Sequence, residues 1–279
     1  METNLSKMLS ILLTALVLLI AINSVVSVTP TFSFYQAQLI QPTYAHGSGG
    51  GNNGGGKFTC PTIAGADSST CSLNWSGYAD TGSSGSVTYV GGSWTVPTLS
   101  CPSSGTQYVA MWVGIDGYNS NTVEQTGVLG ECNNGAASYS AWYEFYPSPS
   151  VTITGFTVRP GDTILANVSF ANGVFTVKIQ DGTQYFSTTG TVSNAARSSA
   201  EWIIERPALC SAHHCSLTTL APFGSVTFSS ATATLNSVTG SISGFTDVAI
   251  TMVASSHGPV LAEPSSLSSG GSSFTDTYV

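Results

Sequence analysis

Short apolar segments separated by turn residues recur from Asn74 to the end of the chain. They alternate apolar and polar positions with a period of two, which is typical of half-buried strands. The clearest are SVTYVGGSWTVP, YVAMWVGID, SYSAWYEFYP, DTILANVSF, GVFTVKIQDG, AEWIIERP, GSVTFSSATATL and DVAITMV. Ala171-Asn172-Gly173 and Asp181-Gly182 predict hairpin turns. Because no helical pattern separates the strands, the sequence predicts an all-β fold, an antiparallel two-sheet β-sandwich.

The amino-terminal part of the chain has a different pattern. Lys7 precedes an apolar run from Met8 to Ile22, so residues 1–28 are predicted to be a signal peptide for secretion. An uncleaved membrane anchor is the alternative, because the run approaches the ~20 residues that span a bilayer. Residues 29–57 have no core pattern and end in HGSGGGNNGGGK, which indicates a pro-segment or glycine-rich linker. The folded domain is expected at residues 58–279.

Charge is scarce and mainly acidic. The chain has 14 Asp and Glu against 6 Lys and Arg, a net charge of −8, and no cluster of basic residues. This composition excludes a nucleic-acid partner and gives no basic patch for a membrane surface. With so few ion pairs to lose and modest self-repulsion after carboxylate protonation, the predicted domain suits an acidic, extracellular environment. We expect it to be a monomer.

Six cysteines follow the export signal, and an even number in an exported chain predicts disulfides. Cys210 and Cys215 are expected to close one hairpin, while the pairing of the other four stays open. His213 and His214 lie between this pair and offer an alternative, a metal site. An oxidising compartment favours the disulfide, so no metal and no cofactor are predicted.

Several predicted strands place carboxyl or amide groups beside aromatic side chains. Strand parity puts these residues on common faces within their strands: Trp112 with Asp116, Val123 with Gln125, Trp142 with Glu144 and Tyr146, and Glu201 with Glu205. One interpretation is an ordinary solvent-facing surface. The other is a substrate groove, which the rarity of acidic residues in this chain favours because carboxyl groups among Trp and Tyr tend to have shifted pKa values.

A set of strings in a fixed order then resembles a known family. NWSGY (Asn74–Tyr78), WVGIDG (Trp112–Gly117), EQTG (Glu124–Gly127), AWYEFYP (Ala141–Pro147), PGD (Pro160–Asp162), AEWIIE (Ala200–Glu205) and the terminal TYV are similar to the eqolisin family of glutamic peptidases. The resemblance covers about Asn74 to Val279. It implies a secreted acid endopeptidase on a concanavalin A-like or jelly-roll-like sandwich, with proteins or peptides as substrates.

The resemblance also implies roles for single residues. The catalytic pair would be Gln125 and Glu205, with Asp116 and Glu144 as supporting hydrogen-bonding residues. Three aromatic residues would line the groove: Trp75, Trp112 and Tyr146. The hairpin closed by Cys210 and Cys215 has a family counterpart beside the active site.

The chemistry of this pair is consistent with acid pH. Glu205 can take a proton from the attacking water and return it to the leaving amine. Gln125 can donate an amide N–H to the oxyanion, and neither role needs a histidine, which would be protonated in acid. The two side chains are expected to converge from neighbouring strands. Glu201 lies ~13 Å from Glu205 along its strand, too far for proton transfer, and is expected to have a structural or groove-rim role.

Other functions compete with this interpretation. Asp80-Thr81-Gly82-Ser83 matches the DTGS string of aspartic peptidases, but a second such string is missing and a turn is the preferred interpretation. A carbohydrate-active or carbohydrate-binding sandwich is the main alternative, because Trp and Tyr beside carboxyl groups also suit sugar rings. Serine or cysteine catalysis lacks its G-x-S-x-G elbow. Arg206, which follows Glu205, departs from the family pattern and should face away from the groove.

Overall fold

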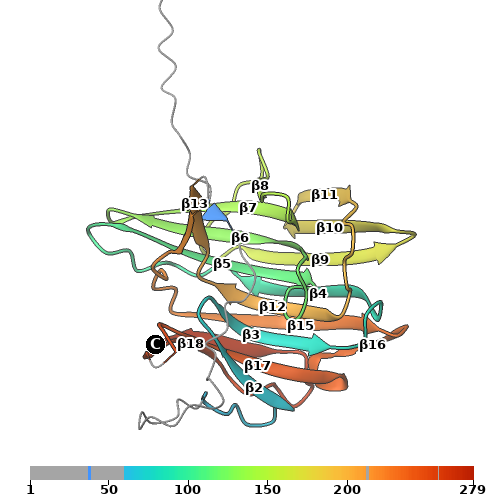
Figure 1. The fold of residues 1–279 in the computed structure, drawn as a ribbon. Coiled ribbons are helices and arrows are strands. Elements are labelled where there is room, and N and C mark those ends of the chain that lie inside the picture. The colour runs from blue at the N-terminus through green and yellow to red at the C-terminus, as the bar shows by residue number, and fades with distance from the viewer. Residues whose placement is uncertain (1–36, 39–59, 212–213, 257) are drawn as a thin grey trace, which may run out of the picture. The chain divides into compact units, whose positions relative to one another are not determined.

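β-Strands make up nearly all of the regular secondary structure in the described part of the chain. The computed structural model describes residues 37–38, 60–211, 214–256 and 258–279, within the unit Tyr35–Val279. Its strands form two connected sheets with antiparallel pairing throughout the main path, as predicted (Figure 1). The predicted signal peptide and nearly all of residues 29–57 lie outside the described residues.

The larger sheet, called the long sheet below, has the order β19-β18-β17-β3-β12-β5-β6-β7-β8. In Figure 1 it can be followed from β7 through β12 and β3 to β17. β2 adds to β17 in parallel, the one departure from the antiparallel prediction among the described pairs. The strands are β2 (Ser68–Ser72), β3 (Trp75–Thr81), β5 (Thr106–Ile115), β6 (Val123–Asn133), β7 (Ala136–Tyr146), β8 (Val151–Thr152), β12 (Ser199–Glu205), β17 (Thr246–Val253), β18 (Val260–Pro264) and β19 (Phe274–Tyr278).

The second sheet, the short sheet, has the order β11-β10-β9-β4-β15, with β16 beside β15. Its strands are β4 (Val87–Thr95), β9 (Thr163–Ala171), β10 (Val174–Asp181), β11 (Gln184–Gly190), β15 (Ser225–Leu235) and β16 (Val238–Ser241). Both predicted hairpin turns are confirmed, since β10 pairs with β9 on one side and β11 on the other. Asn172 and Gly173 adopt positive φ in the first turn and Gly182 in the second, which explains the residue types.

One strand belongs to both sheets. Residues 225–228 of β15 pair with β19 of the long sheet, whereas residues 229–235 pair with β4 of the short sheet. The register shifts between Ser229 and Thr232, and Ser230 between them has a φ of 51°. This irregularity bends β15 so that it passes from one layer into the other.

The main core lies between the two sheets. On β10, Phe175, Val177 and Ile179 are fully buried and alternate with half-buried or exposed residues, the pattern of a strand with one apolar face. On β5, Met111 and Val113 turn toward the same core. The opposite face of the long sheet carries a second buried cluster, the tryptophan cluster: Trp75, Ala79, Ala110, Trp112, Val123, Trp142, Ile203 and Ile250.

β12 contributes to both clusters. All seven of its residues are buried, because β3 and β5 flank it and side chains cover both of its faces. Trp202 and Ile204 face the main core, and Ile203 faces the tryptophan cluster. The Trp202 indole N–H donates a 2.9 Å hydrogen bond to the Gly91 carbonyl of β4, which ties β12 to the short sheet.

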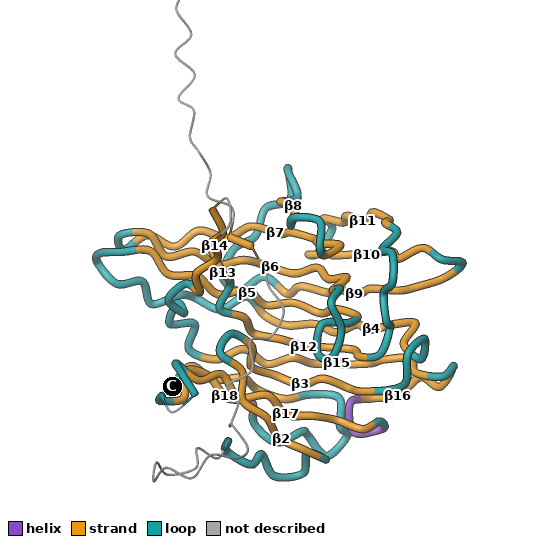
Figure 2. Tube along the Cα trace, viewed as in Figure 1, coloured by secondary structure: helices purple, strands orange, loops and turns teal. Residues whose placement is uncertain are grey.

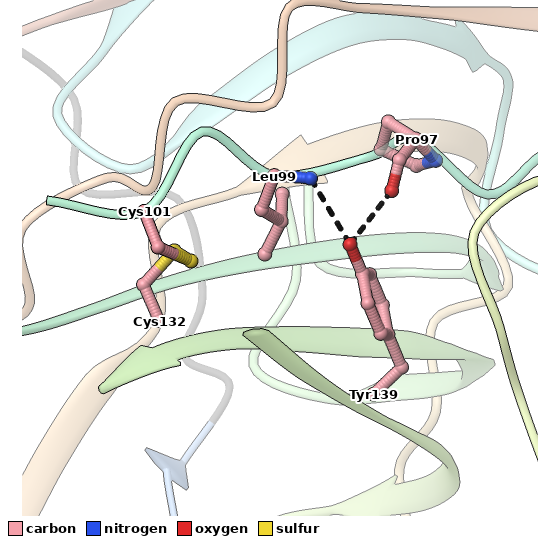
Figure 3. The surroundings of a disulfide bond; sticks show 5 residues. All are labelled: Pro97, Leu99, Cys101, Cys132 and Tyr139. Atoms are coloured by element: carbon pink, nitrogen blue, oxygen red, sulfur yellow. Dashed lines mark hydrogen bonds between the residues drawn. A yellow bond between two sulfur atoms is a disulfide. The ribbon is translucent and has the colours of Figure 1, made fainter. Parts of the chain in front are cut away.

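Two disulfides link elements near the edges of the fold. Cys60 pairs with Cys71 of β2, and Cys101 pairs with Cys132 of β6. Beside the second bond, the Tyr139 hydroxyl donates to the Pro97 carbonyl at 2.8 Å and accepts the Leu99 amide at 3.1 Å (Figure 3). The segment before β5 is thus fixed to β6 and β7 through side chains.

A small three-stranded sheet stands apart from the two layers in its pairing. β13 (Ala208–Ser211) and β14 (His214–Leu217) form a hairpin, and β1 (Ala37–Gln38) pairs with β13. Figure 2 shows the two strands of the hairpin. It also shows η1 (Ile242–Gly244), the one short 3-10 helix of the described residues, beside β16. The register places Cys210 opposite Cys215, and Cys215 is in a disulfide, while the pairing of these two cysteines stays a prediction. The side chain of Cys210 lies outside the described residues.

Candidate active site

Gln125 and Glu205 lie on the same side of the long sheet, facing the tryptophan cluster and not the main core. Gln125 is on β6 and Glu205 on β12, with β5 between them. The expectation that they come from neighbouring strands is therefore wrong. In the register, Gln125 is opposite Gly114, and Glu205 is opposite Ala110, four residues earlier on β5. Both side chains are nearly inaccessible, with exposed fractions of 2% and 0%.

Trp112 fixes the carboxyl group of Glu205. Its indole N–H donates a 2.9 Å hydrogen bond to Glu205 Oε2, and both side chains are fully buried. Trp75, which is opposite Glu205 on β3, packs edge-on against Trp112 with ring centroids 4.8 Å apart. The Trp112 N–H thus orients the carboxyl group within a buried aromatic cluster.

Gln125 is held by a different carboxyl group. Its side-chain amide Nε2 donates a 2.6 Å hydrogen bond to Glu144 Oε2, directly opposite on β7. Burial raises the pKa of Glu144 to about 9, although the hydrogen bond from Gln125 lowers it, and the nearby negative charge of Glu205 raises it further. Glu144 is therefore a neutral acid at acid pH.

Glycines make room for the indole rings. A Cβ atom on Gly114 would lie 3.0 Å from the Trp112 ring and 3.1 Å from Gln125 Cβ, both shorter than ordinary contacts. A Cβ on Gly117 would lie 2.8 Å from the Trp75 ring. The glycines of the WVGIDG string therefore set the positions of the aromatic side chains over the sheet.

Asp116 accepts hydrogen bonds from the segment that leads into β12. Its carboxylate accepts the backbone amides of Arg197 and Ser198, and the Thr122 hydroxyl approaches at 3.5 Å. Asp116 itself has a φ of 70°, a conformation that Asp tolerates better than most residues. The carboxylate thus supports the start of β12, the strand of Glu205, from a position at the end of β5.

Glu201 is fully buried, as Glu205 is, so it does not lie at an exposed groove rim. The Ser199 hydroxyl and the Tyr118 backbone amide face it and favour its charged form. Burial outweighs them and raises the pKa of Glu201 well above its usual range. By register it lies across Gly114 from Gln125, on the same face.

Sequence reasoning missed four other buried carboxyl groups, those of Asp80, Glu124, Asp247 and Asp276. Burial raises the pKa values of Asp80 and Glu124 to about 9 and that of Asp276 to about 8. The predicted turn at Asp80 is wrong, because Asp80 lies within β3, directly opposite Asp247 on β17. Strand parity could have found Glu124, which alternates with Gln125 and so faces the other side of β6.

The remaining predicted residues border the same face. Tyr146 is half-buried at the end of β7 and packs against the tryptophan cluster. The Arg206 side chain faces away from this site, as expected, and donates a 2.6 Å hydrogen bond to the Leu73 carbonyl. In the part of the chain that the structure describes, no group of three or more His, Cys, Asp or Glu could hold a metal ion, and no helix is long and apolar enough to span a membrane.

Comparisons with known proteins agree with this arrangement. The model of the peptidase A4 family matches residues 73–278. Aspergillopepsin-2 of Aspergillus niger is 36% identical over 235 residues, which cover 75% of this chain and 78% of the relative. Scytalidopepsin B of Scytalidium lignicola is 33% identical over 147 residues, 50% of this chain and 54% of the relative.

Solved structures show the same relationship. A scytalido-glutamic peptidase bound to a transition-state analogue inhibitor has a TM-score of 0.63 and 25% identity, covering 74% of this chain and 98% of that chain. Aspergilloglutamic peptidase from Aspergillus niger has a TM-score of 0.52 and 33% identity, covering 62% and 99%. The chain therefore belongs to the peptidase A4, or eqolisin, family and is a glutamic-type endopeptidase.

Proposed function

We propose that this endopeptidase is exported, works in acid, and hydrolyses peptide bonds with Glu205 and Gln125 as its catalytic pair. The observation that carries the proposal is the placement of both side chains on one aromatic face of the long sheet, each oriented by its own hydrogen-bond partner. Proteins and peptides are the substrates, as for the family.

Glu205 performs the proton transfers in this mechanism. As a carboxylate it takes a proton from water while the water oxygen attacks the scissile carbonyl carbon, and it returns that proton to the leaving amine. The Trp112 N–H orients the carboxyl group for both steps. The reaction consumes one water molecule and gives a carboxylic acid and an amine.

Gln125 stabilises the negative charge that develops on the carbonyl oxygen. Its Nε2 has two N–H groups, and Glu144 accepts one of them. The other donates to the oxyanion in a buried, low-dielectric site, where such a donor is typically worth about 10² to 10³ in rate. Because an amide does not titrate and Glu144 is neutral in acid, this half of the site keeps its charge state across acid pH.

Digestion of acid-denatured protein between pH 2 and 5 tests the proposal. Glu205→Gln should abolish cleavage, and Gln125→Ala should lower kcat about 10² to 10³-fold. Glu131→Gln is the matched control, because it removes a half-buried carboxyl group of β6 that lies outside the site. Wild-type activity in a folded Glu205→Gln or Gln125→Ala variant would exclude the proposed pair.

A further inference from the structure

The described part of the chain contains two Asn-X-Ser sequons, the acceptor signal for N-linked glycans: Asn74-Trp75-Ser76 and Asn167-Val168-Ser169. The fold places them very differently. Asn74 is fully buried directly before β3, and its side-chain oxygen accepts a 3.1 Å hydrogen bond from the Ser72 hydroxyl. Its neighbour Trp75 packs inside the tryptophan cluster. This buried position leaves no space for a glycan, so folded protein carries none on Asn74.

Asn167 lies in the other layer, on the outer face of the short sheet. On β9 its neighbours Ala166 and Val168 point into the main core, so the alternation of the strand turns Asn167 away from that core. Asn167 is half-buried, and Leu165 on the same face is 49% exposed, so solvent reaches this face. Glu205 lies on the far side of the long sheet, with the main core between the two layers.

The surroundings of Asn167 suit an attached sugar. Across the ladder it is opposite Gly91 of β4 and Lys178 of β10. The Tyr89 side chain covers this glycine, since a Cβ atom on Gly91 would lie 2.9 Å from Tyr89 Cζ and 3.2 Å from Asn167 Cβ. The Tyr89 ring therefore lies beside the Asn167 side chain and gives the first sugar an aromatic surface. The Asn167 amide makes no hydrogen bond to another described residue, so the fold does not need its nitrogen.

We propose that Asn167 is an N-glycosylation site of this protein and that Asn74 is not. The site requires export of the chain, as proposed above, because the transferring enzymes act outside the cytosol. In the transfer, the Asn167 side-chain nitrogen bonds to C1 of an oligosaccharide that is carried on a lipid diphosphate. The bond from C1 to the diphosphate oxygen breaks, the lipid diphosphate leaves, and the nitrogen loses one proton.

Two substitutions at one position test the site. The full-length chain is expressed in a eukaryotic secretory host, and protein from the medium is mapped by peptide mass spectrometry, with and without peptide:N-glycosidase. The peptide that contains Asn167 should carry the glycan, and the peptide that contains Asn74 should not. Ser169→Ala destroys the sequon and should abolish the modification, whereas Ser169→Thr keeps the sequon and should keep the glycan. Because the glycan lies in the layer opposite Glu205, its removal should leave kcat and KM unchanged.

Two results would overturn the inference: an unmodified Asn167 in folded protein of both the wild type and Ser169→Thr, or a glycan on Asn74 in folded protein. A chain that stays inside the cells would reject the proposed export instead. In that case a host signal peptide in place of residues 1–28 directs the chain past the same transferring enzymes, and the state of Asn167 again decides. A glycan on Asn167 of a protein without peptidase activity would keep the site and reject the catalytic pair.

Discussion

At the residue scale, the proposed site depends on how two side chains are oriented. An indole N–H donates to the Glu205 carboxylate, and the Gln125 amide donates to a carboxyl oxygen of Glu144. Neither partner is charged in acid, because Trp112 does not titrate and burial keeps Glu144 protonated. The site is therefore oriented by neutral groups, which suits an enzyme that works where most carboxylates are protonated.

Trp112→Phe should lower kcat about 10- to 100-fold, because a hydrogen bond to a charged group contributes about 1.5 to 3 kcal/mol and phenylalanine cannot donate it. Steady-state kinetics at acid pH measures the change. Trp142→Phe is the matched control, since Trp142 belongs to the same cluster and its Nε1 has no hydrogen-bond partner among the described residues. Equal losses in the two variants would contradict an orienting role for the Trp112 N–H.

Gly114→Ala should lower kcat by about 10²-fold with a small change in KM, because the added methyl group displaces both the Trp112 ring and Gln125. In a Trp112→Phe background the same substitution should cost less, since the smaller ring leaves space for it. Gly244→Ala serves as control, because nothing lies within 4 Å of its added Cβ. A folded Gly114→Ala enzyme with normal kcat would show that catalysis does not need the space left by the missing side chain at position 114.

At the element scale, β12 decides where the proposed catalytic carboxyl group lies. β3 and β5 pair with it along its whole length, and Trp202 bonds it to the short sheet. Asp116 fixes its beginning through the amides of Arg197 and Ser198. A strand held on both edges, on one face and at its start has little freedom to shift register.

Asp116→Asn should lower the free energy of unfolding by about 1 to 3 kcal/mol, because a neutral amide replaces the acceptor of two buried backbone N–H groups. Asparagine tolerates the positive φ of this position, so the loss reports the hydrogen bonds and not the backbone. Denaturant unfolding measures it. Asp162 accepts the Arg159 amide in a half-exposed turn, so Asp162→Asn should lower the free energy of unfolding by less. A larger loss in Asp162→Asn than in Asp116→Asn would refute this role of Asp116.

The strands and the shared face of the site could be predicted from the sequence, because strand parity depends only on local alternation. AEWIIERP places Glu201 and Glu205 on one face, and the structure agrees. The order of strands could not be predicted, since it depends on pairing between segments far apart in the chain. This is why β5 was not expected between Gln125 and Glu205. Asp80 was assigned to a turn because the string DTGS contains turn residues, whereas pairing with β17 extends β3 through it.

At the scale of the whole molecule, buried carboxyl groups dominate the electrostatics. Burial raises the pKa of Asp80, Glu124 and Glu144 to about 9, that of Asp276 to about 8, and that of Glu201 well above its usual range. Each of these groups holds a proton in the folded state that it loses in the unfolded state above about pH 4. The folded state therefore binds more protons than the unfolded state at neutral pH.

Stability should consequently be highest in acid and should fall as the pH rises from about 4 toward 9. The sign follows from linkage: where the unfolded state binds fewer protons, the free energy of unfolding decreases with pH. Denaturant unfolding at pH 3, 5 and 7 measures the trend. A free energy of unfolding that is constant or rises over this range would contradict the protonated state of these carboxyl groups.

Asp80 offers a single-site test of the same linkage. Neither of its oxygens has a hydrogen-bond partner among the described residues, and its pKa rises from 3.8 to about 9. Between pH 4 and 7 this one group should cost about 4 kcal/mol of stability. Asp80→Asn should therefore flatten the pH dependence by roughly that amount. An unchanged pH dependence in a folded Asp80→Asn variant would exclude Asp80 as a source.

The passage of β15 through both layers affects how well the folded enzyme resists cleavage by other active copies of itself. Because residues 225–228 pair in one sheet and residues 229–235 in the other, detaching either layer also breaks the edge of its partner. Local opening of one layer is therefore disfavoured, and the chain opens mainly by rare, complete unfolding. A protease attacks a loosened chain far more readily than a closed one. One shared strand thus protects a peptidase against cleavage by its own copies.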